Sequence, residues 1–177
     1  EGCQAISTSA YGGGVYVSSS SSFVMTGEAK IKDCQAISNS NSSKGGGVHL
    51  SNATTFTLLG NAVIQNCKAT NSVNSGEAYG GGVSATCVKG ITLEDNARIA
   101  GCIAANGSGL YITGSKNDSS FGQLYANGGS VDGDVVLGDK DKYDGPCTIT
   151  GLGGTVFKGK VTVTPDSTIE KGTFNGE

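Results

Sequence analysis

Six cysteines offer the most reactive side chains of this sequence, and four of them recur at similar intervals. Successive members are 31, 33 and 35 residues apart: Cys3, Cys34, Cys67 and Cys102. Thiols at one position of a stacked repeat would lie within the Cα separation of about 4.4–6.8 Å that a disulfide needs. Stacked side chains point the same way, which makes the disulfide torsion hard to reach. A structural ladder of buried thiols acting as small hydrophobes is therefore favoured.

Two alternatives for the cysteines stay open. One is a disulfide between neighbouring rungs of the ladder, and a second disulfide could join Cys87 to Cys147, which lie outside it. The other is a metal site, which is disfavoured because metal needs converging thiolates and the sequence contains no Cys-x-x-Cys pair.

Acid–base catalysis has little support. A lyase needs a base near an acid cluster, and a hydrolase needs two carboxylates at a fixed separation. The candidates are scattered over strands and turns: Arg98, Lys30, Lys32, Asp33, Glu94 and Asp95. His49 is the single histidine, and no Ser-His-Asp set accompanies it. These side chains are interpreted as solvated surface groups, and no catalytic residue is assigned.

An acidic stretch late in the chain resembles a calcium loop in residue types. It contains Asp139, Asp141 and Asp144, after the earlier pair Asp132 and Asp134. Calcium binds several carboxylate and carbonyl oxygens at about 2.3–2.6 Å. The spacing misses the usual Asp-x-Asp-x-Asp-Gly form, and Lys140 and Lys142 offset the charge. A solvated turn is favoured, with calcium as the alternative, so no cofactor is expected.

These residues are set on a repeat that covers much of the chain. The triplet Gly-Gly-Gly-Val begins at Gly12, Gly45 and Gly80, with spacings of 33 and 35 residues. Within each unit an apolar residue returns after eight positions, as in Val15, Phe23 and Ile31. Each unit then contains Ala-x-Ile-x-x-Cys-x-Ala, so the cysteine ladder belongs to the repeat.

The intervals fit three short strands per unit, because apolar and polar residues alternate with period two. A unit this short cannot bury its own apolar face, so neighbouring units must stack and pair strand on strand at roughly 4.8 Å. The prediction is an all-β fold, a parallel β-helix whose crossover chirality makes it right-handed. The interior residues of the second unit are then Val48, Leu50, Phe56, Leu58 and Ile64.

Composition agrees with this fold and excludes several function classes. The chain of 177 residues has 30 Gly, is 36% hydrophobic, and has a formal net charge of -3. Its 12 basic residues are dispersed among 15 acidic ones, so no nucleic-acid surface is expected. No apolar run reaches the length of about 18 residues that a transmembrane helix needs, so no membrane insertion is expected.

Length varies between units in one place, which predicts surface loops on one edge of the coil. These stretches are Ile37 to Lys44 and Thr70 to Tyr79. Residues 1–113 are expected to form the regular repeats of a single β-helix covering 1–177, and residues 114–177 its irregular final turns. Short strands are expected in these turns at Val135 to Leu137, Thr148 to Thr150, Thr155 to Phe157, Val161 to Val163 and Thr168 to Ile169. The first and last residues suggest a fragment of a longer protein. Three Thr-x-Thr pairs, at Thr55, Thr148 and Thr162, do not recur at the repeat position, so an ice-binding array is set aside.

The motif Gly-Gly-Gly-Val-Tyr, followed by an apolar triplet and Gly-x-Ala-x-Ile-x-x-Cys, resembles the β-helix repeats of bacterial surface proteins. These include adhesin-like proteins, chlamydial polymorphic outer-membrane proteins and autotransporter passengers. The resemblance covers Cys3 to Ile112 and implies an extracellular, surface-located bacterial protein. The same pectin-lyase-like coil also carries polysaccharide lyases and hydrolases, so a glycan-active enzyme is the alternative function.

A binding edge is the functional expectation. The outward residues of the first strand in successive units are Tyr16, His49, Ser84 and Tyr111. They lie beside the variable loops, and aromatic rings with polar tips can stack on sugars or anchor a protein. A host glycan or an extracellular protein is therefore the expected partner at this edge. The alternative is that these are ordinary solvated side chains of a spacer.

Overall fold

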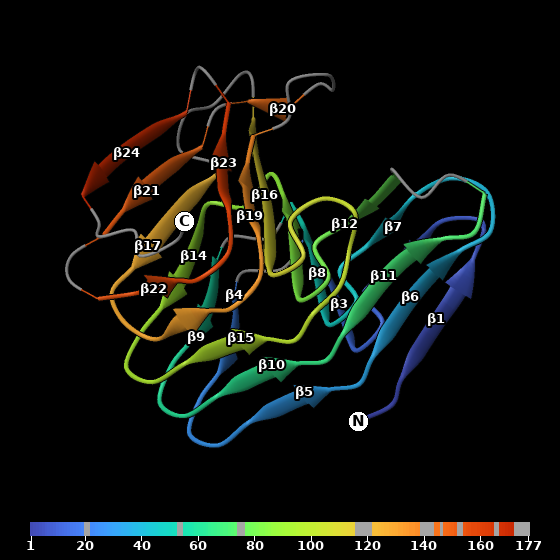
Figure 1. Cartoon of the computed structure of the whole chain (residues 1–177), viewed down its shortest axis with the longest axis horizontal. Coiled ribbons are helices and arrows are strands. Elements are labelled where there is room, and N and C mark those ends of the chain that lie inside the picture. Colours follow the sequence, from blue (N-terminus) through green and yellow to red (C-terminus); the bar gives the residue numbers. More distant parts are fainter. Residues whose placement is uncertain are drawn as a thin grey trace.

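The computed structural model describes residues 1–19, 22–52, 55–73, 77–115, 122–138, 144–145, 147–151, 154–164 and 167–171. The described chain is a coil of short strands that stack turn upon turn into parallel sheets. The predicted all-β fold, a parallel β-helix with three core strands per turn, is confirmed. Figure 1 shows these sheets as separate walls that run along the axis of the coil.

Three sheets form the coil itself. Sheet I contains β3 (Val15–Ser18), β8 (Val48–Ser51), β13 (Val83–Thr86), β16 (Leu110–Ser115), β19 (Val135–Leu137) and β23 (Val161–Val163). Sheet II contains β4 (Ser22–Met25), β9 (Thr55–Leu58), β14 (Gly90–Leu93), β17 (Gln123–Ala126), β21 (Thr148–Thr150) and β24 (Thr168–Lys171). Sheet III contains β5 (Lys30–Lys32), β10 (Val63–Gln65), β15 (Arg98–Ala100), β18 (Ser130–Val131) and β22 (Val156–Phe157).

The coil interior is built from the residues that the eight-residue spacing selects. Val48, Leu50, Phe56, Leu58 and Ile64 each have 0% of their surface exposed. The predicted parity of the strands is therefore confirmed. Like residues stack between turns, as in Phe23 and Phe56, whose ring centroids are 5.3 Å apart at an interplanar angle of 9°. Each turn thus buries the apolar side chains that its neighbour could not bury alone.

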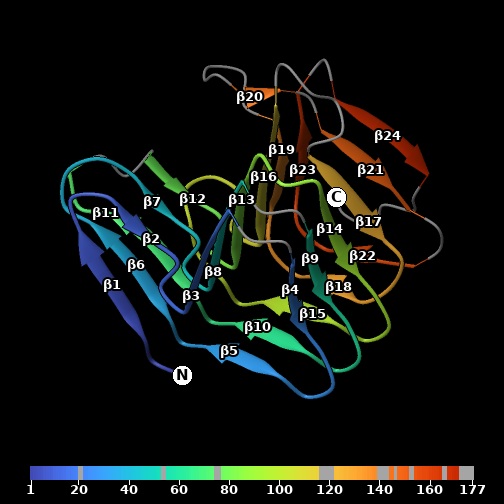
Figure 2. The ribbon, with the colours of Figure 1, turned by 180° about the vertical axis from the view of Figure 1, so that it is seen from behind.

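The expected loops contain strands, and this part of the prediction is wrong. Sheet IV contains β1 (Gln4–Ser7), β6 (Gln35–Ser38) and β11 (Lys68–Asn71), and sheet V contains β2 (Ala10–Tyr11), β7 (Ser43–Lys44) and β12 (Ala78–Tyr79). We call this two-sheet extension the wing. It lies to the right of the coil in Figure 1 and to the left in the reverse view of Figure 2.

Small side chains explain why the wing has no apolar signature in the sequence. The facing positions of sheets IV and V are mostly Ala and Ser, for example Ala36 at 0% and Ala78 at 2% exposure, and the buried Asn71 is a larger exception. Two sheets lined by such residues can approach closely without large hydrophobic side chains. In the third turn the extension is reduced to two isolated parallel bridges, Lys68 to Ile103 and Tyr79 to Asn106. This short turn covers one end of the wing.

The glycine triplet forms the neck where the chain returns from wing to coil. In the second turn Gly45 has a φ of 67°, a left-handed conformation that favours glycine. A Cβ atom on Gly46 would lie 2.4 Å from the backbone N and C atoms of Lys68. The returning chain therefore crosses directly over the strand that leaves, and only glycine permits that approach.

Strands also form beyond residue 113, and they extend the three coil sheets. β19 pairs in parallel with β16, β21 with β17, and β22 with β18. The strands expected at Val135 to Leu137, Thr148 to Thr150 and Val161 to Val163 are present with those bounds. β20 (Asp144–Gly145) pairs antiparallel with β16 and lies off this arrangement.

Candidate functional site

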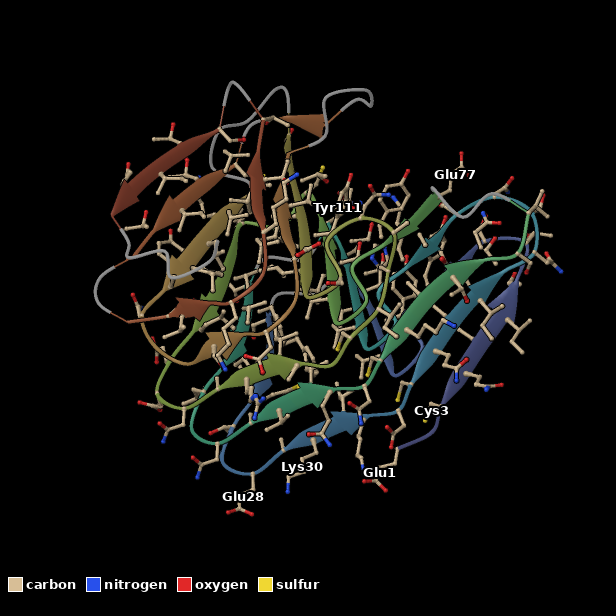
Figure 3. All side chains as sticks on the ribbon, viewed as in Figure 1. Glu1, Cys3, Glu28, Lys30, Glu77 and Tyr111 are labelled. Atoms are coloured by element: carbon tan, nitrogen blue, oxygen red, sulfur yellow. The ribbon has the colours of Figure 1, made fainter. Side chains whose placement is uncertain are left out.

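The four residues of the predicted binding edge lie in one row on the outer face of sheet I. Tyr16 pairs with His49, His49 with Ser84, and Ser84 with Tyr111, each in parallel register. The wing covers most of this row, however. Tyr16 is 51% exposed, whereas His49, Ser84 and Tyr111 are 3%, 0% and 4% exposed. Both interpretations of this edge, a binding surface and a solvated spacer, require exposed side chains, and the last three residues do not meet that requirement. Tyr111 is labelled in Figure 3.

Sheet V supplies the cover. Tyr11 on β2 stacks on His49 with ring centroids 5.2 Å apart, and it lies 5.9 Å from Tyr16. Tyr79 on β12 contacts Tyr111 at 4.9 Å. The Nζ atom of Lys44, on the strand between them, lies 6.0 Å from the centroid of the Tyr79 ring. A second layer of aromatic and cationic side chains therefore joins the wing to the coil.

His49 is the polar centre of this layer. Its ring is stacked on Tyr16 at 5.4 Å, and its Nδ1 atom lies 3.1 Å from the backbone oxygen of Ser84. Burial lowers the pKa of His49 to about 4, with a further lowering by Lys44 and an opposing effect of the Ser84 hydrogen bond. The imidazole is therefore neutral at pH 7. Since a carbonyl only accepts, Nδ1 carries the proton and donates it to Ser84 O.

The open end of the row differs from its buried part. Tyr11 is 37% exposed and Tyr16 is 51% exposed, and the two rings are tilted by 38° relative to each other. Both rest on the buried His49 ring. This arrangement presents two aromatic faces on a rigid base, which suits stacking against a sugar ring or an apolar side chain.

Sequence reasoning did not find Tyr11 and Tyr79 as parts of this region. A signal for them is present, because each immediately precedes a glycine triplet, at Gly12 and at Gly80. The position before the triplet is the last residue of each sheet V strand. A recurring large side chain at that position indicates contact with the next sheet.

The cysteine ladder is in register, as the repeat predicts. The backbone N of Lys68 donates to Cys34 O at 2.8 Å, and that of Ile103 donates to Cys67 O at 2.9 Å. Cys3 is exposed at the end of the row, whereas Cys34, Cys67 and Cys102 are buried, and all four are free thiols. The predicted buried-thiol ladder is thus observed for three of its four members.

Each buried thiol donates to the backbone oxygen two residues before it. The distances from Sγ are 3.3 Å for Cys34 to Lys32 O, 3.2 Å for Cys67 to Gln65 O and 3.4 Å for Cys102 to Ala100 O. Burial raises the pKa of Cys34. The hydrogen bond to Cys102, followed by burial, raises the pKa of Cys67. The hydrogen bond with Cys67 lowers the pKa of Cys102. The thiols fill the space beside the glycine neck, where Cys67 Sγ lies 3.2 Å from the position of a Cβ atom on Gly47.

One ionic cluster forms on the outer face of sheet III. Arg98 donates from Nε to Asp132 Oδ2 at 3.1 Å and from Nη2 to the same oxygen, and Lys158 Nζ lies 3.0 Å from Asp132 Oδ1. Partial burial raises the pKa of Asp132, but the hydrogen bonds from Arg98 and Lys158 outweigh it and leave the pKa lowered. Asp132 therefore remains ionised and links three turns of the coil.

Other predicted ionisable residues have structural contacts. Asp95 Oδ2 accepts from the backbone N of Gly60 at 3.0 Å, and Asp134 Oδ1 accepts from Lys160 N at 2.9 Å. Lys32 pairs with the adjacent Asp33 at 3.5 Å. Lys30 lies on the open side of sheet III, where Figure 3 shows it pointing outward near Glu28. The contacts of Asp95 and Asp134 connect neighbouring turns of the coil. None of these contacts brings an acid and a base together in the arrangement of an active site.

The calcium prediction falls largely outside the described residues. Asp139 and Asp141 are among the residues whose structure is not described, and only the backbone of Asp144, in β20, is described. Among the described residues, no three His, Cys, Asp or Glu side chains form a group that could hold a metal ion. Calcium at this stretch stays an untested alternative to the solvated turn.

Comparison of the chain with protein-family models, with curated proteins and with solved structures finds no match. Within the described ranges no helix has the length and apolar character needed to cross a membrane. The fold itself defines the class of this protein: a repetitive parallel β-solenoid, which carries a two-sheet wing on its first turns.

Proposed function

We propose that this chain is a non-catalytic domain of a bacterial surface protein, an adhesin-like stalk that recognises a glycan or a protein outside the cell. The observation that carries the proposal is the exposed pair of tyrosines, Tyr11 and Tyr16, at the open end of the aromatic row. Of the four residues predicted for the binding edge, Tyr16 keeps this role. His49 acts beneath it as a support.

The support makes the tyrosine pair suitable for recognition. An exposed aromatic side chain loses conformational freedom when it binds, and that loss weakens binding. Here the rings of Tyr11 and Tyr16 are already held by stacking on His49, at 5.2 and 5.4 Å. A ligand that stacks on them therefore meets a preformed surface. The resemblance of the repeat to bacterial surface proteins supports the same location and role.

The distribution of charge supports a role without catalysis. Asp132 is neutralised by Arg98 and Lys158, while Asp95 and Asp134 accept backbone hydrogen bonds. His49, the one histidine, is buried and uses its Nδ1 proton in a structural hydrogen bond. These ionisable groups are used in ion pairs and hydrogen bonds that stabilise the coil, whereas a catalytic acid or base must be able to exchange a proton with a substrate.

A binding screen tests the proposal. The full chain is applied to a glycan array and to immobilised mucin and extracellular-matrix proteins, beside the double variant Tyr11→Ala/Tyr16→Ala. Ile103→Ala is the matched control, because Ile103 is an exposed apolar residue, at 56%, on another part of the surface. We expect binding that the double variant loses and the control retains. Binding that survives the double variant would place recognition elsewhere.

The alternative function, a glycan-active lyase or hydrolase, has one favouring observation. Arg98 and Lys158 flank an ionised carboxylate on the outer face of sheet III, and both are about half exposed. Turnover of a polysaccharide panel, measured as new reducing ends or unsaturated products, tests this alternative. Activity that disappears in Arg98→Ala would replace the non-catalytic proposal with the enzyme.

A further inference from the structure

The outer face of sheet II carries a continuous array of uncharged side chains. Successive strands pair in register, so that their outward residues form two columns along the coil. One column contains Ser22, Thr55, Gly90, Gln123 and Thr148, and the other contains Val24, Thr57, Thr92, Tyr125 and Thr150. Residues within a column lie roughly 4.8 Å apart. No outward position of the described strands from β4 to β21 in this sheet is charged.

This array corrects one expectation from the sequence. The pairs Thr55/Thr57 and Thr148/Thr150 were expected not to share a repeat position, but the sheet II register places both on this face with Thr92 between them. The third pair, at Thr162, belongs to sheet I. The register was hidden because the turns between these pairs differ in length.

Tyr125 is the aromatic member of the array, and one edge of its ring lies beside Gly90. A Cβ atom added to Gly90, on the neighbouring strand, would lie 3.0 Å from Cε2 and 3.5 Å from Cδ2 of the Tyr125 ring. Gly90 is buried, while Tyr125 is 38% exposed. The missing side chain at Gly90 therefore leaves room for this edge of the ring, and part of the Tyr125 side chain stays open to solvent.

We propose that this face of sheet II is a binding site for an uncharged polysaccharide, with Tyr125 as the platform for one sugar ring. The apolar face of a pyranose stacks on an aromatic ring, and its hydroxyl groups exchange hydrogen bonds with neighbouring polar side chains. Thr92 and Thr150 flank Tyr125 in its own column. Thr150 Oγ1 donates to Glu170 Oε2 at 3.1 Å, so the Thr92 hydroxyl is the neighbouring group that the proposal places against the sugar.

The lack of charged outward residues on this face of sheet II favours a neutral ligand over an acidic one. The corresponding outer face of sheet III carries Lys30, Lys32, Arg98, Asp132 and Lys158, whereas the sheet II face has none at its outward positions between β4 and β21. An acidic glycan would gain little at the strands from β4 to β21, because their outward positions carry no cation that offsets the cost of desolvating its carboxylates. The carboxylate of Glu170, which accepts from Thr150, would also repel it. A neutral glucan, mannan or similar chain meets no such cost.

The interruptions of the threonine array favour sugar over ice. An ice-binding surface needs one residue type repeated without a break, but Gly90, Gln123 and Tyr125 stand in the middle of the two columns. An aromatic ring in a field of hydroxyl groups is instead the pattern that suits a sugar. Ice binding is therefore an outcome that the test below must separate from polysaccharide binding.

The site lies on a different sheet from Tyr11 and Tyr16, so it goes beyond the function proposed above and does not depend on it. The experiment uses the full chain and a panel of neutral polysaccharides, namely soluble glucans, mannans, xylans and galactans, with polygalacturonate as the acidic comparison. Binding is measured by affinity electrophoresis and by tyrosine fluorescence, since the chain contains no Trp. We expect at least one neutral polysaccharide to bind and polygalacturonate not to bind.

Variants then locate the site. Tyr125→Ala should weaken binding by about tenfold or more, and Thr92→Ala/Thr150→Ala by a smaller factor. Ile103→Ala changes an exposed apolar residue that belongs to neither proposed site. It is the control and should leave this binding unchanged, with circular dichroism confirming that each variant is folded. Three results would overturn the proposal: no neutral polysaccharide binds, binding survives Tyr125→Ala, or the chain instead inhibits ice recrystallisation and loses that activity in Thr57→Val/Thr92→Val.

Discussion

The coil and the wing bury their side chains in different ways. The coil interior consists of large apolar residues, such as Leu50, Phe56 and Ile64, with no exposed surface. The wing interior consists of small residues, and it adds side-chain hydrogen bonds, as from Ser38 Oγ to Thr8 O at 2.7 Å and from Ser72 Oγ to Ser38 O at 3.0 Å. Both regions obey the same turn-to-turn stacking, but different forces hold them together.

This difference shows what a solenoid repeat requires. Stacking in register satisfies the backbone hydrogen bonds of both regions, so the wing needs no large hydrophobic core of its own. It gains apolar contact instead from the outer face of sheet I, where Tyr11 meets His49 and Tyr79 meets Tyr111. The wing is thus stabilised by its contact with the coil, whereas the coil is stabilised from within.

The largest expected effect tests the coil. Ile64→Asp places an unpaired carboxylate among packed turns and should lower the free energy of unfolding by about 4 kcal/mol or more. The matched control is Thr57→Asp, at an outward position of sheet II, which should cost no more than about 0.5 kcal/mol. Urea denaturation measures both. Equal costs would contradict the assignment of inward and outward faces.

The next effect tests the wing through pH. The pKa of His49 is about 4 in the folded chain, below the ordinary value of 6.5, because the neutral imidazole is buried at the joint between wing and coil. A depressed pKa means that the unfolded chain binds the proton more readily. The contribution of the neutral His49 ring to the free energy of unfolding is therefore complete above about pH 6.5. It is lost as the pH falls toward 4, by about 3 kcal/mol in all.

Carboxylates also titrate at acidic pH, so the measurement needs a reference. Denaturation curves at pH 7.5, 5.5 and 4.5 are compared between the wild-type chain and His49→Phe, which keeps a ring at this position without its proton. The wild-type chain should lose more stability than the variant over this interval. Parallel losses in the two proteins would mean that His49 is not buried in the neutral form.

A smaller effect tests the neck between the two regions. Gly46→Ala adds a methyl group 2.4 Å from the backbone of Lys68, where no flexible side chain can move away, and it should cost about 2 kcal/mol. Gly154→Ala is the control, because a Cβ atom there meets nothing within 4 Å. Thermal unfolding of both variants checks the difference. If Gly46→Ala costs no more stability than Gly154→Ala, the close contact between the segments at Gly46 and Lys68 does not exist in solution.

The sequence predicts the coil well for a physical reason. Large apolar residues at fixed intervals, such as Val15, Phe23 and Ile31, must be buried, and the interval determines which strand each belongs to. Later strands, such as Val135–Leu137 and Val161–Val163, were also predictable from alternation, although the spacing of the glycine triplets no longer holds there.

The wing and the candidate sites were less accessible to prediction. The inward residues of Gln35–Ser38 are Ala36 and Ser38, which are too small to mark a buried strand by an apolar pattern. The burial of His49 depends on a second layer whose existence follows from the wing, which sequence alone did not predict. The pairing of Tyr125 with Thr92, which brings the Tyr125 ring beside Gly90, depends on a register across turns of unequal length, and spacing does not give that register.

The smallest effect concerns a buried hydroxyl in the contact between wing and coil. Ser84 is fully buried between His49 and Tyr111, and its Oγ atom has no hydrogen-bond partner within the described part of the chain. Burying an unsatisfied hydroxyl costs free energy, and its removal leaves a cavity little larger than one atom. Ser84→Ala should therefore leave stability unchanged or raise it by up to about 1 kcal/mol, as measured by urea denaturation. Thr57→Ala, which removes a partly exposed hydroxyl from the coil surface, is the comparison and should bring no gain. A loss of stability in Ser84→Ala would show that this hydroxyl has a partner, and that the contact of wing and coil contains a polar interaction which the coil interior lacks.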